Sequence, residues 1–228
     1  HIDNVLIELD APEVPIMDGS SAIFVRRIDE VGVVSQTSKR RYVKILKDIS
    51  IEDNGSTASL SPDNVSRFTG HIDFDHPVIG QQDYEVKLVN GYFRHDIANC
   101  RTFGFLKDVE YLQKNGLAQG GSLDNAIVLD QANVLNKDGL RHDDEFIRHK
   151  LLDAIGDLYL AGAPILGAYH AEKPSHSINN KLLHALFSQP DAYTIIEMDG
   201  PDSDDIDGSH CSINLNDLTR GITFTQAH

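Results

Sequence analysis

The chain has 228 residues, enough for one large domain or two small ones, and 40% of them are hydrophobic. Its formal charge is −15, with 20 basic and 35 acidic residues. Such a balance argues against nucleic-acid binding, which needs clustered Lys and Arg. No apolar run approaches the roughly 20 residues that span a bilayer, and two cysteines do not make a disulfide framework, so we expect a cytoplasmic protein without membrane spans.

The first forty residues predict a strand, a loop, a helix and a linker, in that order. Apolar and polar side chains alternate over 2–9, which is the period of a strand. A loop reaches Ser20, a short helix covers about 21–31, and the polar segment 35–39 is the best candidate linker. Because His1 leads directly into an alternating run, we expect the chain to be a fragment whose beginning has been removed.

Strands and helices then follow in mixed order. Alternating residues predict strands over 42–45, 56–60 and 67–74 and near 84–89, and a further strand over 126–129. Helices are predicted over about 106–115, around His149, and over about 178–188. This order favours an α+β fold of layered sheets and helices over a βαβ repeat.

The helix around His149 has the clearest pattern in the chain. Seven apolar residues between 146 and 159 fall at helical spacing, which predicts a buried amphipathic helix. Asp143 or Asp144 can cap its start, and Gly162 with Pro164 can end it.

This helix carries His149, Asp153 and Asp157 at positions i, i+4 and i+8, on one face. An imidazole and a carboxylate one turn apart can bind a divalent metal together, which suggests a zinc site. The spacing alone is a weak signal. His71 and Asp75 are also four residues apart, but in a predicted strand they would lie roughly 13 Å from each other, too far to share an ion.

The tail from Met198 is acidic and has two interpretations. As a calcium loop, 203–208 lacks the first Asp, and Asn214 stands where a bidentate Glu is required. A solvated loop is the favoured interpretation.

Several separated motifs together resemble one enzyme family. They are the run from Ile2-Asp3-Asn4 to Met17-Asp18-Gly19-Ser20, Arg101-Thr102-Phe103-Gly104-Phe105, the segment 149–157, and His176-Ser177-Ile178-Asn179-Asn180. In this order they are similar to UDP-3-O-acyl-N-acetylglucosamine deacetylase, the zinc-dependent enzyme of lipid A biosynthesis in Gram-negative bacteria. The similarity covers residues 1 to about 197.

The resemblance implies two similar α+β halves, each a two-layer arrangement of a sheet on helices, with the active site between them. Residues 1–36 would be the end of the first half, which is only partly present. Residues 40–228 would be the complete second half, with a βαβ-type insert for the acyl chain at about 104–130 and an acidic tail at 198–228.

The resemblance also implies a zinc site with two histidines and one aspartate as ligands. His149 and Asp153 match the second and third ligands. The first ligand histidine and the neighbouring general-base glutamate would precede Ile2, and His1 should not be taken as a ligand. Because two ligands are too few, we expect the chain by itself to hold zinc poorly, and its activity alone is doubtful.

Catalytic roles follow from the same resemblance. His176, oriented by Asp157, would stabilise the tetrahedral oxyanion, and the Thr102 hydroxyl would add a second hydrogen bond. Zinc would polarise the acetamide carbonyl and lower the pKa of its bound water.

The substrate would be a UDP-linked acylated aminosugar, and the resemblance assigns its contacts. Lys150 and Lys173 would meet the phosphates, Asp73 and Phe74 the uridine, and Phe103 the sugar. The acyl passage would be lined by Leu106, Val109, Gly121, Ser122, Ala126 and Val128.

Three functions therefore stay open at this point. The chain is the larger part of a zinc amidase that releases acetate, a non-catalytic remnant that binds the UDP-sugar and acyl chain, or a structural calcium-loop protein. Without the resemblance, His149 and Asp153 would be a surface pair on a helix, and His176 an ordinary loop histidine.

Overall fold

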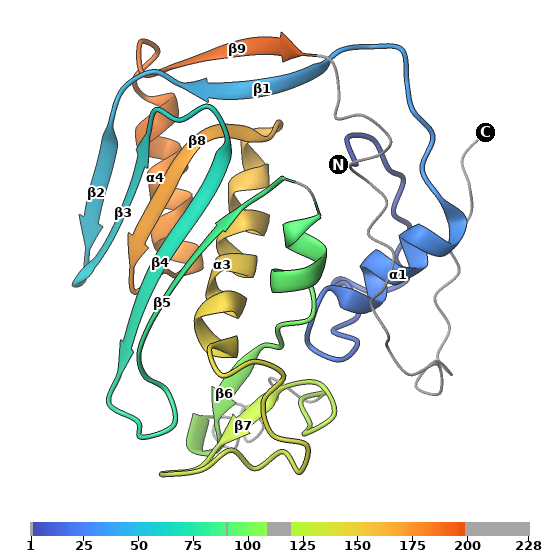
Figure 1. Ribbon diagram of the computed structural model, residues 1–228, viewed down its shortest axis with the longest axis vertical. Coiled ribbons are helices and arrows are strands. Elements are labelled where there is room, and N and C mark those ends of the chain that lie inside the picture. Colours follow the sequence, from blue (N-terminus) through green and yellow to red (C-terminus); the bar gives the residue numbers. More distant parts are fainter. Residues whose placement is uncertain (1, 90, 109–119, 199–228) are drawn as a thin grey trace.

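The computed structural model describes residues 2–89, 91–108 and 120–198 (Figure 1). Its helical elements are α1 (Ala22–Val31), a π-helical turn (Phe93–Ile97), α3 (Glu145–Leu158), a 3-10 turn (Tyr159–Ala161) and α4 (His176–Phe187). Its strands are β1 (Arg40–Ile45), β2 (Ile49–Asp53), β3 (Ser56–Ser61), β4 (Ser66–Phe74), β5 (Gly80–Lys87), β6 (Phe103–Phe105), β7 (Ile127–Leu129), β8 (Ile165–Glu172) and β9 (Tyr193–Met198). The predicted α+β class is confirmed.

Within the described residues, strand β8 is the centre of a seven-stranded sheet. It pairs in parallel with β4 and, at its start, with β1, and it pairs antiparallel with β3. The order runs β2-β3-β8-β1-β9, and the hairpin β4–β5 joins at β8. Three strands therefore converge on β8, which fixes the position of the loop that follows it at residues 173–175.

One face of this sheet is covered by α3 and α4. Leu60, Tyr169, Phe68 and Val86 are directly paired across β3, β8, β4 and β5, so they share one face, and all four are buried. Helix α4 packs on β2 and β3, and α3 packs on β4 and β5. The hydrophobic core lies between these two layers.

Gly70 lets α3 approach the sheet closely. A Cβ at this position of β4 would lie 2.9 Å from Cδ2 of Leu151 and 3.1 Å from Cδ1 of Ile147, closer than side chains normally pack. The absence of a side chain at Gly70 brings the part of α3 that carries His149 against the sheet.

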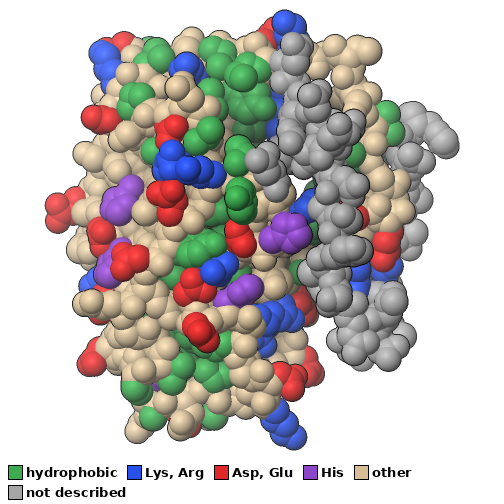
Figure 2. All heavy atoms as spheres, viewed as in Figure 1, with side chains coloured by type: hydrophobic (Ala, Val, Ile, Leu, Met, Phe, Trp, Pro, Cys, Tyr) green, Lys and Arg blue, Asp and Glu red, His purple; other side chains and the backbone are tan. Residues whose placement is uncertain are grey.

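The opposite face of the sheet is polar. Nδ1 of His71 lies 2.8 Å from a carboxylate oxygen of Asp83, and Nε2 of His170 lies 3.3 Å from Glu172. Figure 2, which keeps the viewpoint of Figure 1, shows acidic, basic and histidine side chains interspersed over this side of the molecule. His71 lies in a strand, as the alternation predicts.

The predicted strand over 2–9 is wrong. These residues have no regular secondary structure, and their side chains are exposed. Alternation marks a strand only when a neighbouring strand pairs with it, and within the described residues none pairs with 2–9. The predicted helix over 21–31 is confirmed as α1, which lies beside the main sheet and helices (Figure 1).

Most other predicted elements are confirmed, with four omissions. The strands predicted over 42–45, 56–60, 67–74, 84–89 and 126–129 correspond to β1, β3, β4, β5 and β7. Helix α4 begins at His176, two residues before its predicted start. Strands β2, β6, β8 and β9 are absent from the predicted elements.

Two predictions fall largely or wholly outside the described residues. Of the helix predicted over 106–115, only 106–108 is described, and it is helical. The acidic tail beyond Met198, with its calcium-loop alternative, lies outside.

Strands β6 and β7 pair in parallel, as a βαβ-type insert requires. Among the described residues, no helix has the length and apolar character that crossing a membrane requires.

Candidate functional site

Helix α3 places His149 against a backbone carbonyl and a carboxylate. The His149 side chain is buried, with 7% of the residue exposed. Its Nδ1 lies 3.0 Å from the Cys100 carbonyl oxygen, and its Nε2 lies 3.3 Å from Oδ1 of Asp153, one turn along the helix. A carbonyl accepts only, so Nδ1 carries the proton and donates, which leaves the Nε2 lone pair available.

The spacing of His149 and Asp153 suits a shared metal ion. Zinc binds nitrogen and oxygen at about 2.0–2.2 Å, which in tetrahedral geometry separates two ligand atoms by about 3.3–3.6 Å. Nε2 of His149 and Oδ1 of Asp153 are 3.3 Å apart. In the part of the chain that the structure describes, no group of three or more His, Cys, Asp or Glu could hold a metal ion, so this pair would need a ligand from elsewhere.

Burial keeps His149 neutral. It lowers the pKa of the imidazole because the charged form loses water, and this outweighs the opposing attraction of Asp153. Metal binding requires an unprotonated ring nitrogen, so a lowered pKa favours it near neutral pH.

An ion pair at the start of α3 holds the segment that contacts His149. Glu145, fully buried, accepts hydrogen bonds from the backbone N–H of Arg101 at 2.9 Å and from its Nε at 2.9 Å. Burial opposes ionisation of Glu145, but these bonds and one from the Arg141 N–H lower its pKa. Because Arg101 follows Cys100 directly, the ion pair fixes the carbonyl that orients His149.

A second histidine, His176, lies on the neighbouring helix α4 and is held by a carboxylate of α3. Nδ1 of His176, the first residue of α4, lies 2.8 Å from Oδ2 of Asp157 on α3. Ser175 caps α4 by accepting a hydrogen bond from the Ile178 N–H. The cap fixes where α4 begins and so sets His176 opposite the last turn of α3. The His176 side chain is 72% exposed, so its ring is accessible to a ligand.

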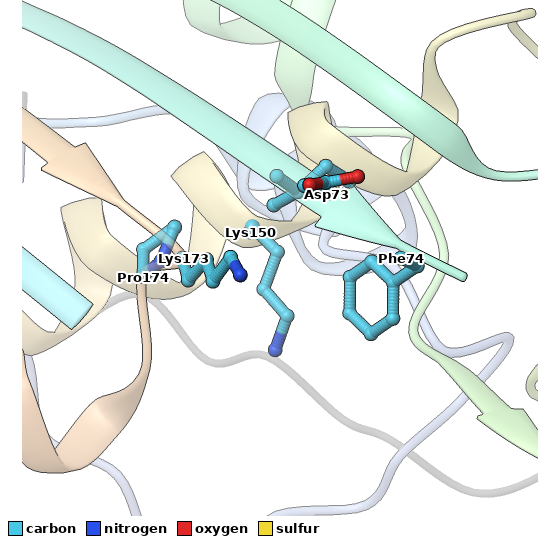
Figure 3. Close-up of a pocket in the computed structure, with 6 residues that line it drawn as sticks. Asp73, Phe74, Lys150, Lys173 and Pro174 are labelled. Atoms are coloured by element: carbon cyan, nitrogen blue, oxygen red, sulfur yellow. The ribbon is translucent and has the colours of Figure 1, made fainter. Parts of the chain in front are cut away.

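Four predicted substrate-binding residues line one pocket. It has a volume of about 240 Å³ and is lined by Ile72, Asp73, Phe74, Lys150, Lys173 and Pro174. Figure 3 shows Lys150, from α3, and Lys173, from the loop after β8, extending into the same space, with the Phe74 ring beside them. The Asp73 carboxylate points away from the two lysine side chains (Figure 3). The pocket therefore combines two cations with an aromatic face.

Phe103 connects this pocket to the His149–Asp153 pair. The Lys150 ammonium lies 5.5 Å from the centre of the Phe103 ring, and the Phe74 and Phe103 ring centres are 5.9 Å apart. On its other side, the Phe103 ring centre is 6.4 Å from that of His149. The cationic pocket and the His149–Asp153 pair are thus parts of one continuous site.

The backbone at Lys173 is strained. Its φ is +54°, in the left-handed region that residues with a side chain rarely adopt, and its N–H donates to the His71 carbonyl at 2.8 Å. Strain of this kind often occurs at functional positions, because the surrounding structure must hold it in place.

Thr102 lies between two residues that contact His149, namely Cys100 and Phe103. Its backbone N–H donates to the Gly19 carbonyl at 2.8 Å. Gly19 has a φ of +82°, and a Cβ there would lie 2.2 Å from the Asn125 carbonyl oxygen. Only glycine fits, which explains its place in the Met17–Ser20 motif and joins this loop to the site.

The residues predicted to line an acyl passage belong to the insert around β6 and β7. Val128 is buried, whereas Leu106 and Ser122 are exposed, and Gly121 and Ala126 are partly buried. Val109 lies outside the described residues. The passage stays a prediction.

Sequence reasoning gave no role to two buried residues behind His176. Asn179 and Tyr169 form hydrogen bonds that lead to Asp157. The position of Asn179, one helical turn after His176, was the available signal for one of them. Tyr169 lies on β8, a strand that was not predicted.

A neutral histidine and an aspartate at the spacing of metal ligands, next to a second histidine held by a carboxylate, are typical of metal-dependent hydrolases. Residues 1–188 match the family model of UDP-3-O-acyl N-acetylglycosamine deacetylase. The chain belongs to this family.

Curated relatives with the name UDP-3-O-acyl-N-acetylglucosamine deacetylase agree with this match. The chain is 49% identical over 197 residues to that of Haemophilus influenzae strain 86-028NP, which covers 86% of this chain. It is 48% identical over 200 residues to that of Shewanella frigidimarina, which covers 87%. The chain spans 65% of the length of either relative.

Proposed function

We propose that the protein hydrolyses the acetamide of UDP-3-O-acyl-N-acetylglucosamine and releases acetate, as a zinc-dependent enzyme of lipid A biosynthesis. Family membership supports the reaction, and the chain's own residues support the site. His149 and Asp153 would hold the zinc ion, together with a ligand from outside the described residues. Zinc, when bound, supplies a Lewis acid for the amide carbonyl and an activated water.

The chain's own residues would bind and orient the substrate. Lys150 and Lys173 would neutralise the diphosphate, and the Phe74 ring would stack on the uracil, with Asp73 as a further uridine contact. Phe103, between the pocket and His149, would pack on the sugar. These positions would deliver the acetamide to the zinc end of the site.

His176 would stabilise the negative charge that develops on the amide oxygen. Its Nδ1 donates to Asp157, so Nε2 would face the substrate, and the protonated ring would donate a hydrogen bond there. The Thr102 hydroxyl would add a second donor. In the acyl passage, the lipid chain would follow the insert at 104–130.

A single observation carries this proposal. The His149–Asp153 pair lies on α3, and His176 lies at the start of α4, held by Asp157 of α3. The pocket is lined by Lys150 of α3 and by Lys173 of the loop after β8. Each feature alone is common, but their continuity through Phe103 matches the sequence of groups on a UDP-sugar: base, diphosphate, sugar and amide.

Zinc content and turnover of two variants test the proposal. Asp153→Ala should lose zinc and activity together. His176→Ala should keep zinc but lose about 10²–10³ in kcat, the usual loss for one oxyanion donor. Both are measured by metal analysis and acetate release from the UDP-sugar.

Matched controls are available on the polar face of the sheet and at the surface. His170→Ala removes a histidine that pairs with Glu172, and Asp191→Ala removes an exposed aspartate that pairs with Lys47. Both should keep zinc and turnover. A near-normal rate in His176→Ala would disprove its role.

A second candidate function is a non-catalytic module that binds the UDP-sugar and acyl chain. It is favoured by the observation that the described residues supply two metal ligands and no group of three. Tight stoichiometric zinc in the 228-residue chain would contradict it. UDP binding without zinc or acetate release would support it.

We also propose that residues 1–36 end a first half of the enzyme and that 40–228 form the second half. The sheet begins at Arg40, and the segment 33–39 before it is exposed. A cytoplasmic location fits a nucleotide-activated substrate.

A further inference from the structure

Behind His176, a chain of buried hydrogen bonds runs from the sheet to Asp157. The Tyr169 hydroxyl, on β8, lies 2.6 Å from Oδ1 of Asn179 on α4. Nδ2 of Asn179 lies 2.9 Å from Oδ2 of Asp157, the oxygen that also accepts from His176. Asn179 is 0% and Tyr169 is 1% exposed. These hydrogen bonds thus join two fully buried side chains to the exposed imidazole of His176.

From this geometry we infer that Asn179 and Tyr169 are positioning residues, which hold the Asp157 carboxylate so that it fixes the ring of His176. The inference rests on the proposed function for its effect on turnover. Its structural part, the fixed orientation of His176, does not.

The donor and the acceptor of each of these hydrogen bonds are fixed. An ionised carboxylate only accepts hydrogen bonds, so Asn179 must turn its NH₂ group toward Asp157. Its carbonyl oxygen then faces Tyr169, whose hydroxyl must donate. Burial, and next the nearby Asp157 charge, raises the pKa of Tyr169, which keeps the phenol protonated as a donor.

The fold sets these groups in place without any loop. His176 and Asn179 are three residues apart on α4 and share the face that meets α3. The Tyr169 ring is held against Phe68, with ring centres 5.4 Å apart. Asp157 is therefore approached by His176 from the exposed side and by Asn179 from the core.

In the protonated form of His176, both ring nitrogens carry a proton, and Asp157 would set the direction of the Nε2–H. In the neutral form, Asp157 also decides which ring nitrogen carries the single proton. With Asp157 held in place, Nδ1 must donate to the carboxylate, and Nε2 is directed outward. An unconstrained neutral imidazole in water carries its proton mostly on Nε2. Loss of the hydrogen bond from Asn179 should let the Asp157 carboxylate rotate. Neutral His176 should then shift toward the tautomer that carries its proton on Nε2.

Nitrogen NMR of the 228-residue chain with ¹⁵N-labelled histidine tests this directly. In the wild type, neutral His176 should show a protonated Nδ1. Asn179→Ala should give a mixture with protonated Nε2, and Tyr169→Phe, which keeps the ring and removes only the hydroxyl, should shift in the same direction. If Asn179→Ala does not fold, Tyr169→Phe carries the test.

Turnover of the intact protein gives the second measurement. Asn179→Ala should lower kcat about tenfold, the range for one lost hydrogen bond to a charged group, with KM unchanged. Tyr169→Phe should lower kcat about twofold to fivefold, because it removes one neutral hydrogen bond. A role in stability alone would lower the melting temperature and leave both the tautomer and kcat unchanged.

Matched controls remove the same groups elsewhere on α4 and beside it. Asn180→Ala makes the same change at the neighbouring exposed position. Tyr193→Phe removes a hydroxyl from a ring that packs on Phe187, at the far end of the helix. Both should leave the tautomer and kcat as in the wild type.

The outcomes separate this inference from the proposed function. A wild-type tautomer in both Asn179→Ala and Tyr169→Phe overturns the positioning role. A changed tautomer in these variants of the 228-residue chain, together with an intact zinc-loaded protein that releases no acetate, supports the positioning role and disproves the deacetylase function.

Discussion

At the scale of single residues, Gly19 shows how a loop far from α3 in sequence becomes part of the site. Its carbonyl accepts from Thr102, and its backbone lies against the Asn125 carbonyl. We predict that Gly19→Ala lowers the free energy of unfolding by about 2–4 kcal/mol, because a Cβ meets backbone that cannot move aside. Chemical denaturation measures this.

Gly55→Ala is the matched control for that prediction. Gly55 has nearly the same φ, +77°, in the β2–β3 turn, and no atom lies within 4 Å of an added Cβ. It should cost only the backbone strain, about 1–2 kcal/mol. Equal losses in both variants would show that the contact with Asn125 is unimportant.

Also at this scale, the two lysines of the pocket should govern nucleotide affinity. We predict that Lys150→Ala and Lys173→Ala each weaken UDP binding about tenfold to a hundredfold, because each removes a charged contact to phosphate. Calorimetric titration with UDP measures the change. Lys47→Ala, at a surface pair with Asp191, should bind UDP normally. Unchanged affinity in both pocket variants would place the nucleotide elsewhere.

At the scale of elements, the start of α3 depends on the buried pair of Glu145 and Arg101. The pKa of Glu145 lies below its usual value in the folded protein, so its ionised form stabilises the fold at pH values above the pKa that Glu145 has in the unfolded chain. That stability is lost as the pH falls through the lowered folded value. We predict that Glu145→Gln is destabilised by about 3 kcal/mol at pH 7, because Arg101 loses its partner.

The pH profile makes that prediction specific. Between pH 7 and 3 the wild type should lose stability more steeply than Glu145→Gln, in which this group no longer titrates. Thermal unfolding across that range measures both. Asp191→Asn removes a carboxylate that is fully exposed and should leave the profile nearly unchanged. Parallel profiles for wild type and Glu145→Gln would contradict the role of the pair.

The elements also show what sequence patterns could and could not predict. Helix α3 was predictable because its apolar spacing is strong and local. Strand β8 was missed because it is covered on both edges and reads as a nearly continuous apolar run, a pattern that buried helices share. The exposed segment 2–9 has the alternation of a strand without forming one, because alternation says nothing about pairing.

The same difference between local sequence patterns and contacts of distant segments applies to the site. His149, Asp153 and Asp157 could be placed on one face from spacing alone, and the family resemblance supplied Lys150, Lys173 and His176. The contact of His149 with the Cys100 carbonyl could not be predicted, since it joins residues 49 positions apart through backbone. Likewise, Asn179 reaches Tyr169 only because α4 packs on β3, the strand that pairs with β8.

At the scale of the whole molecule, residues 2–36 are connected to the sheet by an exposed segment but held by specific contacts. Asp18 pairs with Arg141 at 2.8 Å, and Ser21 donates to the Ala98 carbonyl at 3.0 Å. We predict that limited proteolysis cuts within 33–39 and that the two pieces stay associated on a sizing column. Mass spectrometry identifies the cut.

Arg141→Ala supplies the comparison, because it removes the contact to Asp18 and should weaken that association. Separation of the pieces from the wild-type chain after cutting would show that residues 1–36 are not held by these contacts.

The central claim is that α3 presents an imidazole nitrogen and a carboxylate oxygen to the same zinc ion. Anomalous diffraction at the zinc edge, from crystals of the zinc-loaded protein, tests it most directly. We expect one strong peak about 2.0–2.2 Å from Nε2 of His149 and from a carboxylate oxygen of Asp153. A fully occupied zinc bound elsewhere, with both side chains left uncoordinated, would contradict it.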